Sequence, residues 1–183
     1  MGLMLLGLLL WFDAHLFKRI LPRQRAQLGD KGRGLVALML LVGVVLMVLG
    51  YRAASGPVWW GAGPALKGIN NLLVLAGFYL FAADGMKTWA GRRLRHPQLT
   101  GFALWAGGHL IVNGDLPSVI LFGGLMLWAL VEMAVINHQE PHWTPVEAPV
   151  NARKEAMALV GALLVYGVVG LIHAQLGPNP FGG

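Results

Sequence analysis

The chain has 183 residues, of which 56% are hydrophobic and 12% are charged, and its formal net charge is +6. Soluble domains have about 25% charged residues, so this composition excludes a disordered chain and an ordinary cytosolic enzyme. Cysteine is absent, which excludes disulfides, thiolate chemistry, Cys-ligated zinc and iron–sulfur clusters. The composition predicts an integral membrane protein, and its continuous apolar runs predict spanning helices rather than strands.

Six apolar segments approach the roughly 20 residues that a helix needs to cross a bilayer. In chain order they cover residues 1–17, 35–51, 69–86, 99–112, 117–136 and 156–176, and the fourth is short. The first is not expected to be a cleaved signal peptide, because its basic residues follow the apolar run. The sequence therefore predicts an all-α integral membrane fold, a single bundle of about six transmembrane helices.

The basic residues predict one orientation for this bundle. Twelve of the 14 Lys and Arg residues lie in the first, third and fifth loops between the predicted spans. Basic residues collect in cytoplasmic loops, so we expect these loops in the cytoplasm and both termini on the non-cytoplasmic side. The same distribution points to the lipid bilayer as the partner and argues against nucleic acid.

Ionisable residues within apolar spans are costly, so each is a candidate site residue. The candidates are Asp13, His15, Asp84, His109, Glu132 and His173. We expect Asp84 to pair with Lys87 three residues later. Glu132 has no partner on its own helix, so we expect it to be protonated or to reach an arginine at the cytoplasmic face.

His109 is the deepest histidine, about 18 Å along the helix from Pro97. Gly107 and Gly108 leave room beside it for a flat ligand or for another helix. Neutral imidazole is a good ligand for iron, zinc or copper, and His15 offers a second one near the cytoplasmic end of the first span. Two such residues on separate helices could hold a haem from both faces, provided that helix tilt absorbs their different depths. Each histidine also has a simpler interpretation. His109 could form a hydrogen bond to a neighbouring helix, and His15 could lie at the membrane interface. His173 is a third candidate ligand.

The tripeptide Arg95-His96-Pro97 opens the fourth span, where proline suits the first helical turn. Together with Arg92 and Arg93, it could bind an anionic group such as a haem propionate or another cofactor carboxylate. The alternative is a basic cluster that only sets the membrane orientation.

Two blocks of residues resemble the NnrU family of small bacterial membrane proteins over nearly the whole chain. The first is Phe12-Asp13-Ala14-His15, and the second runs through Arg95-His96-Pro97-Gln98, Leu104-Trp105, His109 and Asn113-Gly114-Asp115. The chain is also similar to the NnrU-type domain of plant 15-cis-zeta-carotene isomerase, which carries a histidine-ligated haem b. The resemblance implies a single domain over residues 1–183 that binds haem b. It implies that His15 and His109 are the axial ligands and that Arg95, His96, Trp105 and Asn113 lie near the cofactor. Leu16 departs from the family pattern, in which a serine commonly follows the first histidine.

The resemblance also implies a biological setting. NnrU proteins are associated with nitrite and nitric oxide reduction in denitrifying bacteria, so we expect a multi-pass protein of the bacterial inner membrane. Nitric oxide or a hydrophobic polyene is then an expected ligand, with redox or isomerase-like chemistry at the haem.

Two other functions stay open at the level of sequence. Arg95-His96-Pro97 with Gly101 is similar to the RHPxxxG element of membrane methyltransferases that use S-adenosylmethionine, although their paired acidic residues are missing here. A non-catalytic partner of a denitrification complex would use the glycine-lined helix faces as an interface.

Overall fold

The computed structural model describes residues 1–181, and eight helices make up most of them. They are α1 (Gly2–Ile20), α2 (Pro22–Gln27), α3 (Gly29–Arg52), α4 (Pro64–Met86), α5 (Trp89–Arg93), α6 (Pro97–Val112), α7 (Leu116–Gln139) and α8 (Ala152–Leu176). The β-type pairing in these residues is an isolated antiparallel bridge between Val58 and Asp115. The all-α prediction is therefore confirmed.

Each of the six predicted spans coincides with a long helix, but several of these helices extend beyond the predicted ranges. The first helix continues to Ile20, and α7 continues to Gln139, so that Asn137 and His138 are helical rather than part of a loop. Two short helices, α2 and α5, were not predicted because their polar sequences carry no apolar periodicity.

Four helices, α3, α4, α7 and α8, are long and apolar enough to cross a membrane. The helix α1 carries three charged residues, Asp13, Lys18 and Arg19. The helix α6 has 16 residues, about 24 Å, which is less than the roughly 30 Å of a hydrocarbon core. The chain is thus a membrane protein with several apolar helices.

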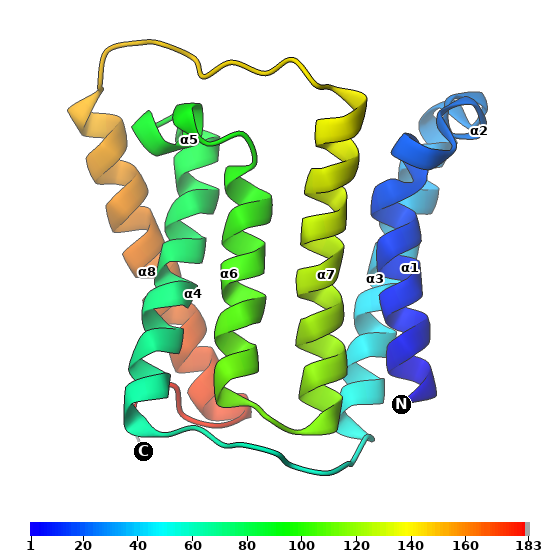
Figure 1. Cartoon of the computed structure of the whole chain (residues 1–183), viewed down its shortest axis with the longest axis vertical. Helices are drawn as coiled ribbons and strands as arrows, with labels where there is room; N and C mark the ends of the chain where they lie inside the picture. Colours follow the sequence, from blue (N-terminus) through cyan, green and yellow to red (C-terminus); the bar gives the residue numbers. More distant parts are fainter. Residues whose placement is uncertain (182–183) are drawn as a thin grey trace.

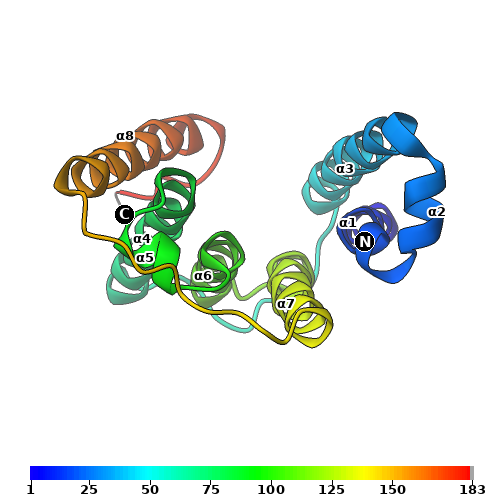
Figure 2. The same cartoon turned by 90° about the horizontal axis from the view of Figure 1, so that it is seen from above.

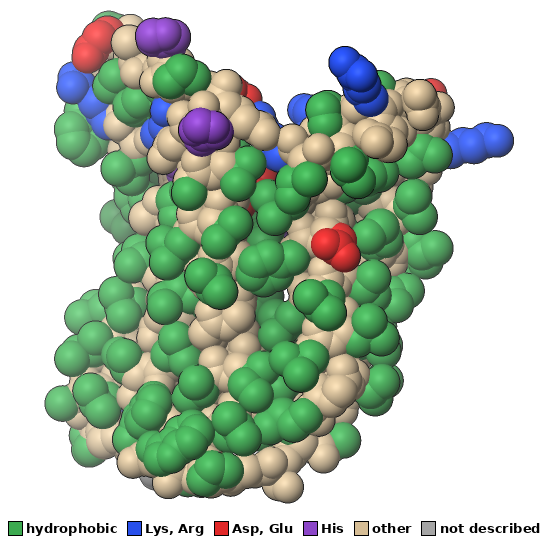
Figure 3. Space-filling model, turned by 45° about the vertical axis from the view of Figure 1, so that its right-hand side comes forward, with side chains coloured by type: hydrophobic (Ala, Val, Ile, Leu, Met, Phe, Trp, Pro, Cys, Tyr) green, Lys and Arg blue, Asp and Glu red, His purple; other side chains and the backbone are tan. Residues whose placement is uncertain are grey.

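The long helices stand side by side in the order α8, α4, α6, α7, α1, α3, and seen from above they form a crescent (Figures 1 and 2). The three connections that were expected in the cytoplasm, which contain α2, α5 and residues 140–151, all lie at one end of the bundle (Figure 1). Arg153 and Lys154, expected in the last of these connections, lie at the same end but in the first turn of α8. Lys, Arg and His side chains gather at that end in Figure 3, and apolar side chains cover most of the length below it. This basic end is where the three predicted cytoplasmic loops meet.

Glycines bring the helices of two pairs into close contact. A Cβ built on Gly77 of α4 would lie 2.7 Å from the carbonyl oxygen of Gly101 on α6. In the second pair, a Cβ on Gly7 of α1 would lie 2.6 Å from the carbonyl oxygen of Gly43 on α3. Small residues of this kind let helix backbones approach closely, which is how helices pack where the hydrophobic effect is absent.

Large apolar side chains cover the outside of the bundle. Leu41 on α3 and Leu164 and Leu171 on α8 are 62%, 64% and 64% exposed. Contiguous exposure of this kind is unfavourable in water, so these faces contact lipid acyl chains.

We predict that Gly77→Ala lowers the stability of the fold by about 1–3 kcal/mol, because the new methyl group meets backbone that cannot move aside. The matched control is Gly68→Ala on the same helix, where a Cβ meets nothing within 4 Å. Thermal unfolding in detergent would measure both variants. Equal melting temperatures for the two variants would contradict the close α4–α6 contact.

Candidate functional site: two histidine layers

His109 on α6 is oriented by a hydrogen bond within its own helix. Its Nδ1 lies 2.9 Å from the carbonyl oxygen of Trp105, one turn earlier. A carbonyl oxygen only accepts, so Nδ1 carries the proton, and the neutral ring keeps its lone pair on Nε2. A bond of this type is the usual support of a metal-ligating histidine.

His15 on α1 repeats this arrangement. Its Nδ1 lies 2.9 Å from the carbonyl oxygen of Trp11, again four residues earlier. Both histidines therefore belong to a Trp-x-x-x-His turn, and each leaves Nε2 available.

The two imidazoles pack against different turns of α7. The His15 ring lies 4.4 Å from the ring of Trp128, whereas the His109 ring stacks 4.7 Å from that of Phe122. Six residues separate Trp128 from Phe122, which is about 9 Å along the helix. The His15 and His109 rings therefore belong to two layers of the bundle.

Aromatic rings fill the space between these layers. Phe102 of α6 lies 5.9 Å from Trp11, 5.0 Å from Trp128 and 5.2 Å from Trp105, measured between ring centroids. Trp105 in turn lies 4.9 Å from His109. The shortest series of ring contacts from His15 to His109 thus passes through three other aromatic side chains.

These positions decide how the site fits a haem. The chemistry of each donor fits, because each has Nδ1 bonded and Nε2 available. A single iron held by both His15 and His109 would require Phe102, Trp105 and Trp128 to leave the space between them. The packing fits one histidine per iron.

Four buried side-chain polar atoms in residues 1–181 make no hydrogen bond: Trp11 Nε1, Trp128 Nε1, Glu132 Oε2 and Asn70 Oδ1. The Trp11 and Trp128 rings lie beside His15, whereas Asn70 lies on α4 next to Gly108. Glu132 is only 9% exposed and lies one turn beyond Trp128 on α7. A buried polar group without a partner costs about 1–3 kcal/mol, so this layer favours water or a ligand with polar atoms.

The third candidate, His173, is exposed on α8, and its Nδ1 donates to the carbonyl oxygen of Pro178 at 2.8 Å. Within residues 1–181 there is no group of three or more His, Asp or Glu side chains that could hold a metal ion.

The Arg-His-Pro motif holds the connection between α7 and α8. Arg95 donates to the carbonyl oxygen of Glu140, and His96 Nε2 lies 2.9 Å from Asn137 Oδ1. Two neighbours add to this, since Arg93 pairs with Glu147 at 3.0 Å and Arg92 donates to the carbonyl oxygen of Pro149 at 3.2 Å. These side chains lie at the basic end, about 18 Å along α6 from His109. The structure therefore does not bring Arg95 and His96 together with His109.

The predicted Asp84–Lys87 ion pair is confirmed, with 3.0 Å between Lys87 Nζ and Asp84 Oδ1.

Asn113 and Asp115 form a corner at the opposite end of the bundle. The Asn113 side-chain amide donates to the carbonyl oxygen of His109 at 2.8 Å. The Asp115 carboxylate caps α7 by accepting from the backbone N–H of Ser118 at 3.0 Å and from its hydroxyl at 2.7 Å. The Tyr51 hydroxyl lies 2.8 Å from the Ser118 hydroxyl, which ties α3 to α7. Sequence reasoning missed this network, although Asp115-x-x-Ser118 has the spacing of a helix cap.

The loop before α4 closes this end beneath α6. Trp60 Nε1 donates to the carbonyl oxygen of Leu110 at 3.0 Å, and the Trp59 N–H donates to that of Gly114 at 2.8 Å. Gly114 is required here because a Cβ would overlap the Trp60 ring. This loop therefore packs on the α6–α7 corner.

These features define a helical membrane protein with two tryptophan-supported histidines on neighbouring layers. The family model described as NnrU protein matches residues 3–180, and the chain belongs to the NnrU family. No curated protein and no solved structure matches the chain.

We predict that Ser118→Ala destabilises the protein by about 1–3 kcal/mol, because it leaves the hydroxyl of Tyr51 and one oxygen of Asp115 without their partner in a corner where Ser118 is 0% exposed. Tyr51→Phe should cost less, since Asp115 and Ser118 keep their mutual bond. Thermal unfolding in detergent measures both changes. An unchanged melting temperature for Ser118→Ala would contradict the network.

A second prediction concerns Glu140, just beyond α7. A hydrogen bond and ion pair with Arg19 lower the pKa of the Glu140 carboxyl below its ordinary value. The contact therefore contributes stability above the ordinary carboxyl pKa and loses it as the pH falls through the lowered value. Carbon-13 NMR of the carboxyl should show this pKa moving back up in Arg19→Gln. An identical titration in wild type and variant would rule out the contact.

Proposed function

We propose that this NnrU protein is a haem b protein of the bacterial inner membrane in which His109 ligates the iron. The proposal includes six membrane crossings, one for each long helix, with the basic end in the cytoplasm and both termini on the other side. It is supported by the gathering of most Lys and Arg residues at one end, in the connections that contain α2 and α5 and in the first turn of α8, since positive residues favour the cytoplasmic side. Tilting of neighbouring helices or local thinning of the bilayer accommodates the short helix α6.

The observation that carries the haem proposal is the bonding of the His109 ring. The Trp105 carbonyl fixes the tautomer, so that Nε2 can bind iron without first losing a proton. Gly107, two residues earlier, would place a Cβ only 3.5 Å from the thioether sulfur of Met126, an ordinary contact with a flexible side chain. A planar ligand beside α6 therefore meets a side chain that can move aside.

When bound, haem supplies an iron that can take up a small ligand such as nitric oxide at a position that the protein leaves open. The chain's own contribution is the fixed imidazole, the aromatic walls formed by Trp105 and Phe122, and an apolar surrounding that excludes water. One histidine per iron leaves such a position open. An open position on the iron supports the link to nitrite and nitric oxide reduction. A hydrophobic polyene is the second candidate ligand.

His15 is the other candidate ligand, in its own layer. Its ring has the same supporting bond, and the Trp11 and Trp128 indole N–H groups beside it have no acceptor. These features fit a role for His15 as a polar contact for the bound molecule.

The geometry gives the methyltransferase alternative less support. Gly101, the glycine of that motif, is explained by its close packing against Gly77. The arginine of the motif, Arg95, binds the start of the α7–α8 connection at Glu140.

The test is the haem content of histidine variants, measured by absorbance of purified protein expressed with ample haem. We expect His109→Ala to lose most of the Soret absorbance and His15→Ala to retain it. His138→Ala, at the exposed end of α7, is the matched control. A His109→Ala protein with wild-type haem content would refute the assignment, and loss of haem in both His109→Ala and His15→Ala would refute the one-ligand arrangement.

A further inference from the structure

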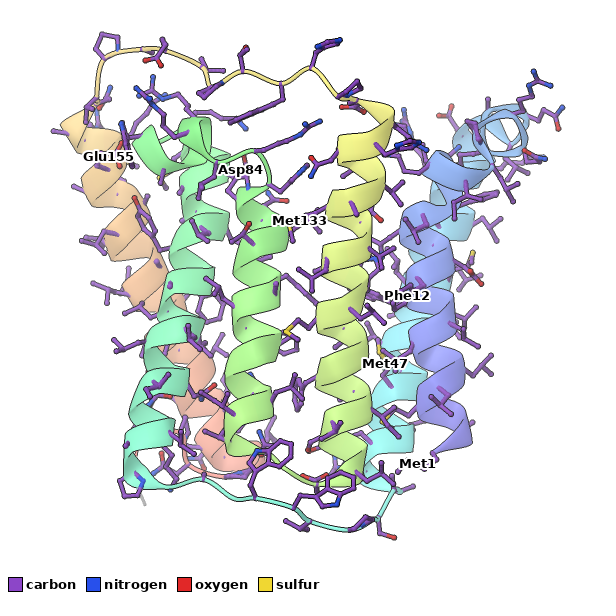
Figure 4. All side chains as sticks on the ribbon, in the orientation of Figure 1. Met1, Phe12, Met47, Asp84, Met133 and Glu155 are labelled. Carbon is purple, nitrogen blue, oxygen red and sulfur yellow. The ribbon has the colours of Figure 1, made fainter. Side chains whose placement is uncertain are left out.

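A cavity of about 480 Å³ opens at the basic end of the bundle, between the last turn of α4 and the first turn of α8. Three cationic side chains line it: Lys87, Arg153 and Lys154. Figure 4 labels Asp84 on α4 and Glu155 on α8, which mark the two sides of this region at the same height. The cavity lies far from both histidine layers, so nothing in the haem proposal uses it.

The charges of this cavity are only partly neutralised. Lys87 pairs with Asp84 at 3.0 Å, whereas Arg153 and Lys154 make no ion pair within residues 1–181. The nearest acid along the chain, Glu155, accepts instead from the backbone N–H of Trp89 at 2.6 Å. An excess of positive charge therefore remains around the cavity.

The rest of the lining is apolar. Met86 and Met157 line the cavity together with the cations, and Met157 is 49% exposed. Below them, Val160 and Leu164 on α8 are exposed at 54% and 64%. The positive charges thus stand at the end of an apolar surface that faces lipid chains. A free anion would need only the charges, whereas an amphiphile would use both parts.

We propose that this cavity binds the phosphate head group of an anionic phospholipid. The phosphodiester lies among Lys87, Arg153 and Lys154, and the acyl chains follow the exposed apolar face of α8. Basic pockets between membrane helices at the cytoplasmic side bind lipids in this way. Charge alone does not define the site, because Arg23, Lys31 and Arg33 are equally basic and exposed but line no part of this cavity.

The test is native mass spectrometry of the full-length protein in mild detergent, titrated with phosphatidylglycerol or with phosphatidylcholine of the same chain length. We expect wild type to bind one phosphatidylglycerol at least about tenfold more tightly than phosphatidylcholine. The triple variant Lys87→Gln, Arg153→Gln, Lys154→Gln should lose this preference. The control triple variant Arg23→Gln, Lys31→Gln, Arg33→Gln removes the same charge and should keep it.

Two further arms make the outcome decisive. The charge-conserving variant Lys87→Arg, Arg153→Lys, Lys154→Arg should keep the preference, which separates loss of charge from loss of folding. Inorganic phosphate in millimolar excess should not displace the lipid; displacement would overturn the lipid assignment in favour of a soluble anion. Equal loss in both neutralised triple variants, or none in either, would overturn the proposal. Bound lipid is counted by mass, so the result does not depend on haem content.

Discussion

The hydrogen bond from each imidazole to a tryptophan carbonyl one turn earlier is the interaction on which the site depends. Within a membrane, a polar group without a partner costs several kcal/mol. A hydrogen bond to the backbone of the same helix satisfies Nδ1 without using another side chain. It leaves the lone pair of Nε2 free to bind a metal. His15 and His109 use this same arrangement, at 2.9 Å in both cases. The helices thereby carry two prepared imidazoles into an apolar environment.

Helix packing then determines what these imidazoles can do. Close glycine contacts hold α1 against α3 and α4 against α6, and α7 lies between the two pairs (Figure 2). Because Trp128 and Phe122 lie on different turns of α7, they hold the two rings in different layers. The polar side chains are also divided between two regions along the length of the bundle. His15 and His109 occupy the apolar length, whereas arginines and lysines at the basic end fix the α7–α8 connection and line a cavity.

The six long helices could be predicted from the sequence because each is a nearly continuous apolar run, and helices satisfy their own backbone in lipid. The candidate histidines could be found because ionisable residues at membrane depth are rare. Their separation into layers could not be predicted, since it depends on which α7 side chain meets each ring. The hydrogen-bond partners of Arg95 and His96 could not be predicted either, because Glu140 and Asn137 are more than 40 residues away in the sequence. Both histidines follow a tryptophan by four residues in the sequence. This shared Trp-x-x-x-His spacing could have predicted that their rings make the same hydrogen bond.

The measurement that tests the central claim most directly is the absorbance spectrum of the purified wild-type protein, as isolated and after reduction with dithionite. The account predicts a Soret band that shifts on reduction and that responds to added nitric oxide, because one imidazole per iron leaves a position open. A featureless spectrum after expression with ample haem would contradict the claim that the tryptophan-supported histidines are haem ligands.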